Sequence, residues 1–306
     1  MVEVVVDADR CSVRFSGISS FSLKDTIQCG QAFRWKEAGP DNSSYIGVAK
    51  GRVLQVRQED NCLILEGPIN EDTVNMVMDY FALDIDLGRI EDQLREIDPL
   101  MDLAIDYAPG IRLLRQDPWE ALVTFIISAR NSIPLIARSV ELLAEKYGDP
   151  IQNRCGDGTS RRYYSFPTPE ALSAAYIEGL LDCRTGFKAP YIKEASERIA
   201  SGEFDLYGIR NMEYFEAKEK LMEIKGVGNK VSDCILLFAF GFYRAFPVDV
   251  WVTRIMRYFY FDSKKVPLRV ISEFAYEKFG DLAGYAQQYL FYYGRNKLGA
   301  EIRGLE

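Results

Sequence analysis

Lys230 follows a pair of glycines in the sequence KGVGNK, which spans residues 225–230. Paired glycines let a chain turn tightly, and without a Cβ atom the amides of Gly226 and Gly228 can approach a phosphate closely. The helix that begins after the turn directs its positive N-terminal end toward such an anion. The segment therefore indicates a helix-hairpin-helix element at about residues 212–240. An ordinary glycine-capped turn between two helices is the alternative interpretation.

Asp249 stands in the sequence FPVDVW, directly before a helical run at residues 252–258, so it is a candidate helix cap. A carboxylate there can also serve chemistry together with Lys230. A lysine amine that acts as a nucleophile must be neutral, and burial favours the neutral form. Attack on an electrophilic carbon can yield a Schiff base, and a nearby carboxylate can stabilise positive charge that develops there. A solvated helix lysine and a structural cap are the alternatives for the two residues.

The composition excludes several classes of site. The chain of 306 residues has no histidine, which rules out catalytic triads and zinc sites that need imidazole. Its six cysteines are scattered singly, so we expect reduced thiols rather than disulfides or a metal site. No stretch approaches the roughly 20 apolar residues of a membrane span, and the first residues do not resemble an export signal. We therefore expect a cytoplasmic protein that needs no metal and no organic cofactor.

The charge is distributed unevenly along the chain. Residues 1–100 hold 18 acidic and 10 basic side chains, which accounts for the whole formal net charge of −8. Residues 218–265 hold nine basic and five acidic side chains. An acidic total therefore does not exclude a nucleic-acid partner, and phosphate contact is expected near the hairpin.

The pattern of apolar residues predicts an α+β fold that is mostly helical. Short alternating runs predict an antiparallel sheet with strands at residues 2–6, 11–15, 45–49, 53–57 and 62–66. From about residue 72 the spacing is helical, and helices are predicted at 117–127, 133–146, 170–176, 191–201 and 212–224. We divide the chain into an N-terminal sheet domain at residues 1–110 and an all-α region in two lobes at residues 111–306.

The hairpin, the lysine after its second glycine and the PVD sequence together resemble the signature of the helix-hairpin-helix (HhH-GPD) DNA glycosylase superfamily. Further motifs, over nearly the whole chain, resemble the 8-oxoguanine DNA glycosylases, and in particular their bacterial members. The resemblance implies a bifunctional base-excision repair enzyme, with Lys230 as the nucleophile and Asp249 as its electrostatic partner. It also implies a strand-cleaving AP lyase activity and a partner that is double-stranded DNA with an oxidised guanine. We expect a monomer that associates with the nucleoid of a prokaryotic cell.

The residues that bind the damaged base follow from the same resemblance. The sequence QCGQAFRW at residues 28–35 is similar to the family's glycine loop, in which the carbonyl of Gly30 accepts a hydrogen bond from N7–H of 8-oxoguanine. Gln287 matches the residue that reads the Watson–Crick edge, and Phe291 matches the ring that stacks on the flipped base. Cys234 matches the residue on the opposite face of the base. A β-turn and ordinary core packing are the alternatives.

The residues that face the duplex are also implied by the resemblance. Asn131 matches the polar residue that fills the gap beside the orphaned base, and Phe187 matches an aromatic wedge. Leu135 and Lys188 occupy the places of two arginines that read the opposite cytosine, and neither offers a bidentate fork. The sequence therefore predicts relaxed specificity for the opposite base. Trp251 stands where the eukaryotic pattern has histidine, so any role of imidazole there is missing.

Other glycosylases and other classes of protein are alternatives to this interpretation. Endonuclease III and the adenine glycosylases carry a four-cysteine iron–sulfur cluster near the C-terminus, whereas no cysteine follows Cys234 here. Alkylpurine glycosylases typically lack the nucleophilic lysine. A glycosylase for another damaged purine and a non-catalytic DNA-binding module remain as alternatives, and trapping of a Schiff base with borohydride separates the module from an enzyme. No pair of acidic residues stands out as the centre of an unrelated enzyme.

Overall fold

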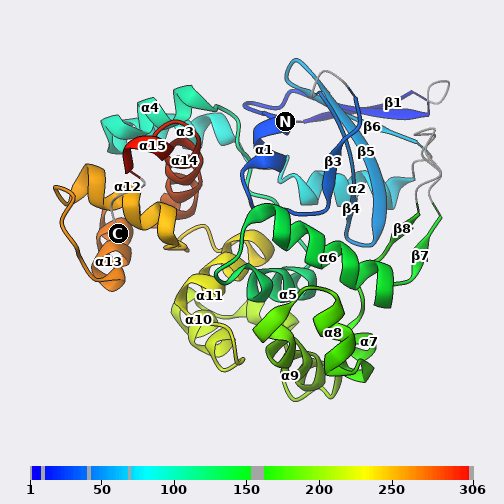
Figure 1. The fold of residues 1–306 in the computed structure, drawn as a ribbon. Helices are drawn as coiled ribbons and strands as arrows, with labels where there is room; N and C mark the ends of the chain where they lie inside the picture. The colour runs from blue at the N-terminus through cyan, green and yellow to red at the C-terminus, as the bar shows by residue number, and fades with distance from the viewer. Residues whose placement is uncertain (1, 8–10, 40–42, 68–69, 153–161, 303–306) are drawn as a thin grey trace.

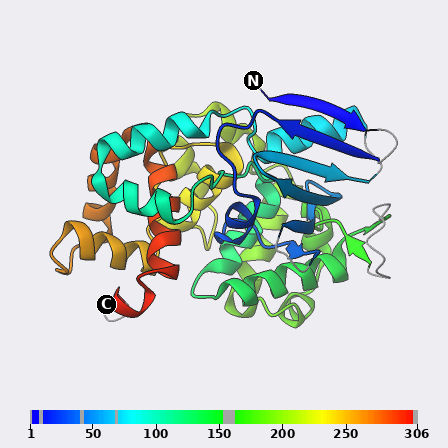
Figure 2. The same ribbon diagram turned by 90° about the horizontal axis from the view of Figure 1, so that it is seen from above.

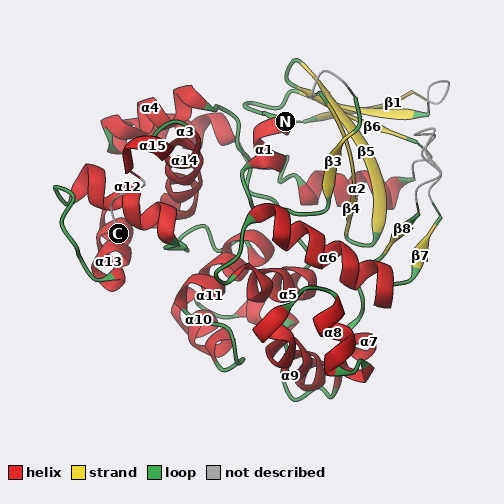
Figure 3. Cartoon of the chain, viewed as in Figure 1, coloured by secondary structure: helices red, strands yellow, loops and turns green. Residues whose placement is uncertain are grey.

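The computed structural model describes residues 2–7, 11–39, 43–67, 70–152 and 162–302. An antiparallel sheet, a middle helical lobe and a C-terminal helical lobe surround the short helix α1, Leu23–Gln28 (Figure 1). Strands occupy one corner of the molecule and helices make up most of the rest (Figure 3). The predicted α+β class, with an N-terminal sheet and a two-lobed helical region, is confirmed.

Six antiparallel strands form the N-terminal sheet in the order β1-β2-β6-β5-β4-β3. Their bounds are Glu3–Asp7 (β1), Ser12–Ser16 (β2), Trp35–Glu37 (β3), Ser44–Ala49 (β4), Arg52–Glu59 (β5) and Cys62–Glu66 (β6). The five predicted strands are confirmed with small shifts at their ends. Strand β3 was not predicted, because it has only three residues and shows no alternation of buried and exposed side chains.

The two faces of the sheet pack against different partners, as the alternation of side chains along a strand requires. Tyr45 points to one face, where it joins a core that contains Val77 and Tyr80 of helix α2, Glu71–Tyr80. Ile46 and Val48 point to the other face, where they cluster with Tyr163 of the short strand β8. Strand β8 (Tyr163–Tyr164) pairs with β7 (Pro150–Ile151). The sheet is therefore covered on both sides around β4, whereas the edge strand β1 is largely exposed.

The middle lobe surrounds helix α5, whose residues 118–127 are buried except for Glu120. Asp117 caps this helix by accepting hydrogen bonds from the amides of Trp119 and Glu120, and Pro118 occupies its first turn. The predicted start of this helix is therefore confirmed. The helices of the lobe are α5 (Pro118–Ser128), α6 (Ile133–Tyr147), α7 (Pro169–Ala174), α8 (Ile177–Asp182), α9 (Ala189–Ala200), α10 (Tyr214–Met222) and α11 (Asn229–Ile235).

The C-terminal lobe includes two helices from the N-terminal part of the chain. Its helices are α3 (Leu87–Ile97), α4 (Pro99–Tyr107), α12 (Val250–Tyr260), α13 (Leu268–Phe279), α14 (Ala283–Asn296) and α15 (Gly299–Ile302). Helix α4 packs against α14, and α3 packs against α13 (Figure 2). Leu94 and Met101 accordingly belong to the large helical core rather than to the core of the sheet. The predicted boundary at residue 110 thus falls after two helices that pack with the C-terminal lobe.

Three structural findings concern only the described part of the chain. No helix in it combines the length and the apolar character that crossing a membrane requires. No group of three or more acidic or cysteine side chains there is arranged to hold a metal ion. The five cysteines within the described ranges are free thiols, and Cys155 lies outside those ranges.

Candidate active site

The side chain of Lys230 lies between two helices that are far apart in the sequence. It starts in the first turn of α11, and its Nζ donates a hydrogen bond of 3.0 Å to Oγ of Ser128, at the end of α5. The hydroxyl of Ser128 donates in turn to the carbonyl of Phe125 at 2.7 Å. The ring centre of Phe125 lies 5.4 Å from the amine. The hydroxyl of Ser128 thus holds the amine against an aromatic wall.

The predicted helix-hairpin-helix element is present, with α10 and α11 joined by the turn at residues 223–228. Gly226 has φ +89°, and a Cβ atom there would lie 2.9 Å from the ring of Tyr191. A glycine is therefore required at this position. Gly228 has an ordinary φ of −103°, and a Cβ atom there would meet nothing within 4 Å. The space beside the first amides of α11 is open, as contact with a phosphate would need.

Asp249 caps α12, as its position before that helix predicted. Its Oδ1 accepts a hydrogen bond of 2.8 Å from the amide of Val252. Burial raises the pKa of Asp249, and the amide of Val252 and the charge of Lys230 oppose that rise. The carboxylate lines the same two cavities as Lys230. Asp249 therefore caps α12 and at the same time places its carboxylate beside the amine of Lys230.

The predicted glycine loop follows α1 and is pinned from two sides. Gly30 has φ +86°, a conformation that a side chain would strain. The side chain of Gln31 is buried and donates to the carbonyl of Arg112 at 2.8 Å. On the other side, Nε2 of Gln288 donates to the carbonyl of Cys29 at 2.9 Å. The described residues donate no hydrogen bond to the carbonyl of Gly30, so this acceptor is available to a ligand.

Gln287 and Phe291 lie one turn apart on α14 and line a small inner cavity of about 50 Å³. Gly30 and Cys234 line the same cavity. Gln287 is only 4% exposed, and no described residue provides a hydrogen-bond partner for its Oε1. Burial raises the pKa of the Cys234 thiol to about 11, so it stays protonated at neutral pH. The cavity is far below the 300–1,000 Å³ of ordinary ligand pockets, so entry of a purine has to widen it.

A larger cavity of about 890 Å³ adjoins the inner one. The residues that line both cavities are Gly30, Phe125, Lys230, Asp249 and Phe291. The lining of the larger cavity is mostly positive in charge. Five basic residues line it, and Asp249 is its one acidic lining residue among those described. The basic residues are Arg130, Lys230, Arg254, Arg257 and Arg295. Such a concentration of positive charge in an acidic chain suits a polyanion.

The predicted duplex-facing residues lie on three turns outside the inner cavity. Phe187 is 60% exposed on a short 3₁₀ turn, Gly186–Lys188, and Leu135 is 49% exposed in the first turn of α6. Lys188 is buried, with its Nζ 4.6 Å from the ring centre of Phe187, and burial lowers its pKa. Asn131 is engaged in its own turn, where Nδ2 donates to the carbonyl of Ile127 at 3.3 Å. Neither the amine of Lys188 nor the side-chain amide of Asn131 extends freely into solvent.

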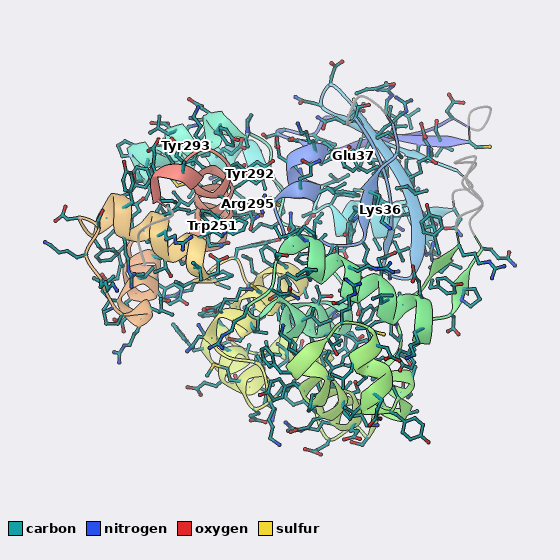
Figure 4. The ribbon with its side chains drawn as sticks, in the orientation of Figure 1. Lys36, Glu37, Trp251, Tyr292, Tyr293 and Arg295 are labelled. Atoms are coloured by element: carbon teal, nitrogen blue, oxygen red, sulfur yellow. The ribbon has the colours of Figure 1, made fainter. Side chains whose placement is uncertain are left out.

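Three residues that were not predicted from the sequence also line the larger cavity. Ser128 holds Lys230, but its partner is 102 positions away in the chain and no local pattern marks it. Arg130 is exposed at the tip of the turn between α5 and α6, with a left-handed φ of +52°. Arg295 lies on α14 and, with Trp251 of α12, on the side of the C-terminal lobe that faces the rest of the molecule (Figure 4). The spacing of Arg295 from Phe291 was the available signal.

Comparisons with known proteins agree with this geometry. Residues 15–122 match the model of the 8-oxoguanine DNA glycosylase N-terminal domain, and residues 123–279 match that of the HhH-GPD superfamily base excision DNA repair protein. A probable N-glycosylase/DNA lyase of Methanothermobacter thermautotrophicus is 31% identical, over 91% of this chain and 95% of its own.

Solved structures extend the similarity to the whole fold. A structure of MBOgg1 in complex with a low-affinity DNA ligand superposes with a TM-score of 0.90 at 41% identity, covering 98% of this chain and 99% of that one. The Clostridium acetobutylicum 8-oxoguanine glycosylase/lyase, in complex with DNA containing cytosine opposite 8-oxoG, gives 0.88 at 39% identity, with 97% and 98% coverage. The chain therefore belongs to the 8-oxoguanine DNA glycosylase family of the HhH-GPD superfamily.

Proposed function

We propose that this protein removes 8-oxoguanine from duplex DNA through a Schiff base on Lys230 and then cleaves the strand at the abasic site. One observation carries the proposal: residues predicted from four separate motifs line the same small cavity. These residues are Gly30, Lys230, Cys234, Asp249, Gln287 and Phe291. The relatives that match over most of this chain are named as N-glycosylase/DNA lyases, which supports both activities.

Lys230 and Asp249 are the proposed catalytic residues. The Nζ of Lys230 forms a bond to C1′ while the bond from C1′ to N9 breaks, and the purine leaves with the bonding pair and takes up a proton. Asp249 stabilises the positive charge that develops on the sugar. The amine then loses its two protons and forms an imine as the bond from C1′ to O4′ opens, and O4′ takes up one of these protons to become a hydroxyl. Removal of a C2′ proton expels the 3′-phosphate by β-elimination, and water hydrolyses the imine to release Lys230.

Gly30 and Gln287 are the proposed readers of the damaged base. The carbonyl of Gly30 is an acceptor, 8-oxoguanine has a donor at N7 and guanine has an acceptor there, so only the oxidised base forms this hydrogen bond. The unpartnered Oε1 of Gln287 can accept from the Watson–Crick edge. Phe291 and Cys234 are proposed to hold the two faces of the base. A base that leaves a buried acceptor of the pocket without a hydrogen bond binds less favourably, so the pocket selects more strongly for the oxidised base.

Relaxed specificity for the opposite base is a second part of the proposal. Leu135 has no polar group that can bind a base edge, and the amine of Lys188 is buried beside Phe187. Phe187 is proposed to press into the step opposite the lesion, and Asn131 to lie in the gap. We expect single-turnover excision rates within about tenfold across the four opposite bases. A preference for cytosine of 100-fold or more would overturn this part.

The proposed substrate is double-stranded DNA, bound by a monomer without a metal. Gly226 and Gly228 of the hairpin are expected to approach a phosphate of the strand that carries the lesion. We place this activity on chromosomal DNA in the cytoplasm, as a repair glycosylase requires. Size measurement of the protein and its DNA complex in solution, with and without chelator, checks the stoichiometry and the independence from metal.

Borohydride trapping tests the catalytic proposal directly. A duplex with one 8-oxoguanine is incubated with the protein and sodium borohydride, which reduces an imine to a stable covalent bond. We expect a covalent complex with the unaltered protein and none with Lys230→Gln. Lys220→Gln, which removes a surface lysine paired with Glu223, is the matched control and should trap normally. Absence of both trapping and base release in the unaltered protein would favour a DNA-binding module.

A further inference from the structure

Helix α14 carries a third residue in line with Gln287 and Phe291. Arg295 lies four positions after Phe291, so the three side chains form one stripe along the helix. The guanidinium carbon of Arg295 lies 5.1 Å from the ring centre of Phe291. Gln287 lines the inner cavity, Arg295 lines the outer one and Phe291 lines both. Arg295 therefore lies at the outer opening of the pocket, and Gln287 lies at its inner end.

The guanidinium is fixed in place, but one of its nitrogens is unused. Nη2 of Arg295 donates to the carbonyl of Gln28 at 3.1 Å, and Nε donates to Asn296 at 3.1 Å. The rings of Phe291 and Tyr292 lie against the cation (5.1 and 5.6 Å). Nη1 is fully enclosed, and no described residue accepts a hydrogen bond from it. A Cβ atom built on Gly30 would lie 3.3 Å from Nη1, so this donor is beside the glycine loop.

A buried charged donor without an acceptor is unfavourable, and its place beside the pocket allows a ligand to supply the missing acceptor. The outer opening of the pocket is where the sugar and phosphates of a nucleotide lie when its base points inward toward Gln287. A guanidinium is well suited to a phosphate oxygen, both in charge and in geometry. We propose that Arg295 binds the phosphate adjoining the flipped nucleotide through Nη1, which becomes accessible when entry of the base widens the pocket. This inference rests on the proposed function, because it assumes that a base enters the inner cavity.

The test compares two variants that differ by one charge, Arg295→Gln and Arg295→Lys. The probe is a duplex with a tetrahydrofuran abasic analogue, which has the phosphates but neither a base nor an aldehyde. We expect Arg295→Gln to bind it about tenfold more weakly, with a slope of log affinity against log salt that is smaller by about 0.9. Arg295→Lys should keep the slope of the unaltered protein, since the phosphate still meets a cation.

Tyr292→Phe is the matched control for a purely structural effect. Tyr292 also joins α14 to α1, through a hydrogen bond of 2.8 Å to Asp25, and its loss should change affinity by less than twofold. An unchanged affinity and salt slope in Arg295→Gln would overturn the inference. A loss confined to a duplex with 8-oxoguanine would also overturn it, in favour of a contact with the base. Failure of the proposed function is visible separately, as absence of borohydride trapping in the unaltered protein.

Discussion

The inner cavity and the duplex-facing surface differ in how their side chains are held before DNA binds. In the inner cavity, Gly30 and Gln287 are fixed by buried elements and still have polar atoms free for a ligand. On the duplex-facing surface, Phe187 and Leu135 are exposed, while Asn131 bonds to its own turn. The groups proposed to read the base are thus already positioned in the free protein, whereas the proposed contacts to the duplex have to form on binding. This difference makes distinct predictions for substitutions in the two regions.

The largest effect is expected for Asp249→Asn in the inner cavity. Asparagine caps a helix as well as aspartate does, so the fold should be retained while the charge is lost. We expect the single-turnover rate of base excision to fall by about 10²–10³-fold, as for loss of one electrostatic contact in other enzymes. Because burial raises the pKa of Asp249, excision by the unaltered protein should decline on acidification at a higher pH than an ordinary aspartate would give.

Two controls belong to this prediction. The midpoint of thermal unfolding of Asp249→Asn should stay close to that of the unaltered protein, and its remaining activity should lack the acidic decline. Retention of more than a tenth of the excision rate in Asp249→Asn would mean that the carboxylate acts only as the cap of α12.

Gly30→Ala should have the next largest effect, and one that depends on the substrate. A Cβ atom at this position would lie 3.0 Å from Ile133 and 3.5 Å from Phe291, and the left-handed φ disfavours alanine. Displacement of the carbonyl should reduce excision of 8-oxoguanine by about 10–100-fold, the usual range for loss of one recognition contact. Cleavage of an abasic site needs no base contact and should change little. Equal losses on both substrates would indicate a general disturbance of the site.

Much of this architecture was predictable because it depends on local patterns. Alternation predicted the strands, Asp117 and Pro118 marked the start of α5, and the spacing of Gln287 and Phe291 placed them on one helix face. Contacts between distant segments were not predictable, since nothing near Ser128 in the sequence signals Lys230. The packing of α3 and α4 in the C-terminal lobe was missed for the same reason.

The turn between α5 and α6 offers a sharper test of the duplex-facing surface. Arg130 is exposed there, and the described residues form no hydrogen bond or ion pair with its guanidinium, whereas Asn131 supports the turn through Ile127 and Ser132. We expect Arg130→Ala to weaken binding of an 8-oxoguanine duplex by about tenfold, with thermal stability retained. Asn131→Ala should instead lower the free energy of unfolding by about 1 kcal/mol.

Affinity and thermal unfolding of the two single variants, measured side by side, decide between these roles. If Asn131→Ala weakens binding more than Arg130→Ala does, then the asparagine leaves its turn to enter the duplex. That result would support the role proposed for Asn131 in the gap, and it would show that this turn rearranges on DNA.

The smallest functional effect is expected outside both regions, at Glu120 in the first turn of α5. Burial raises the pKa of Glu120 to about 7, against the attraction of Arg34. The folded protein therefore favours the protonated carboxyl of Glu120. This contribution to stability is full below the pKa that Glu120 has in the unfolded chain, and it is lost as the pH rises through about 7. Between pH 5 and pH 8, Glu120→Gln should gain about 2 kcal/mol of unfolding free energy relative to the unaltered protein, with excision unchanged. Denaturant unfolding at the two pH values measures the difference. A gain that is the same at both would show that Glu120 is ionised throughout, and a loss of excision would mean that α5 transmits changes at its first turn to Ser128.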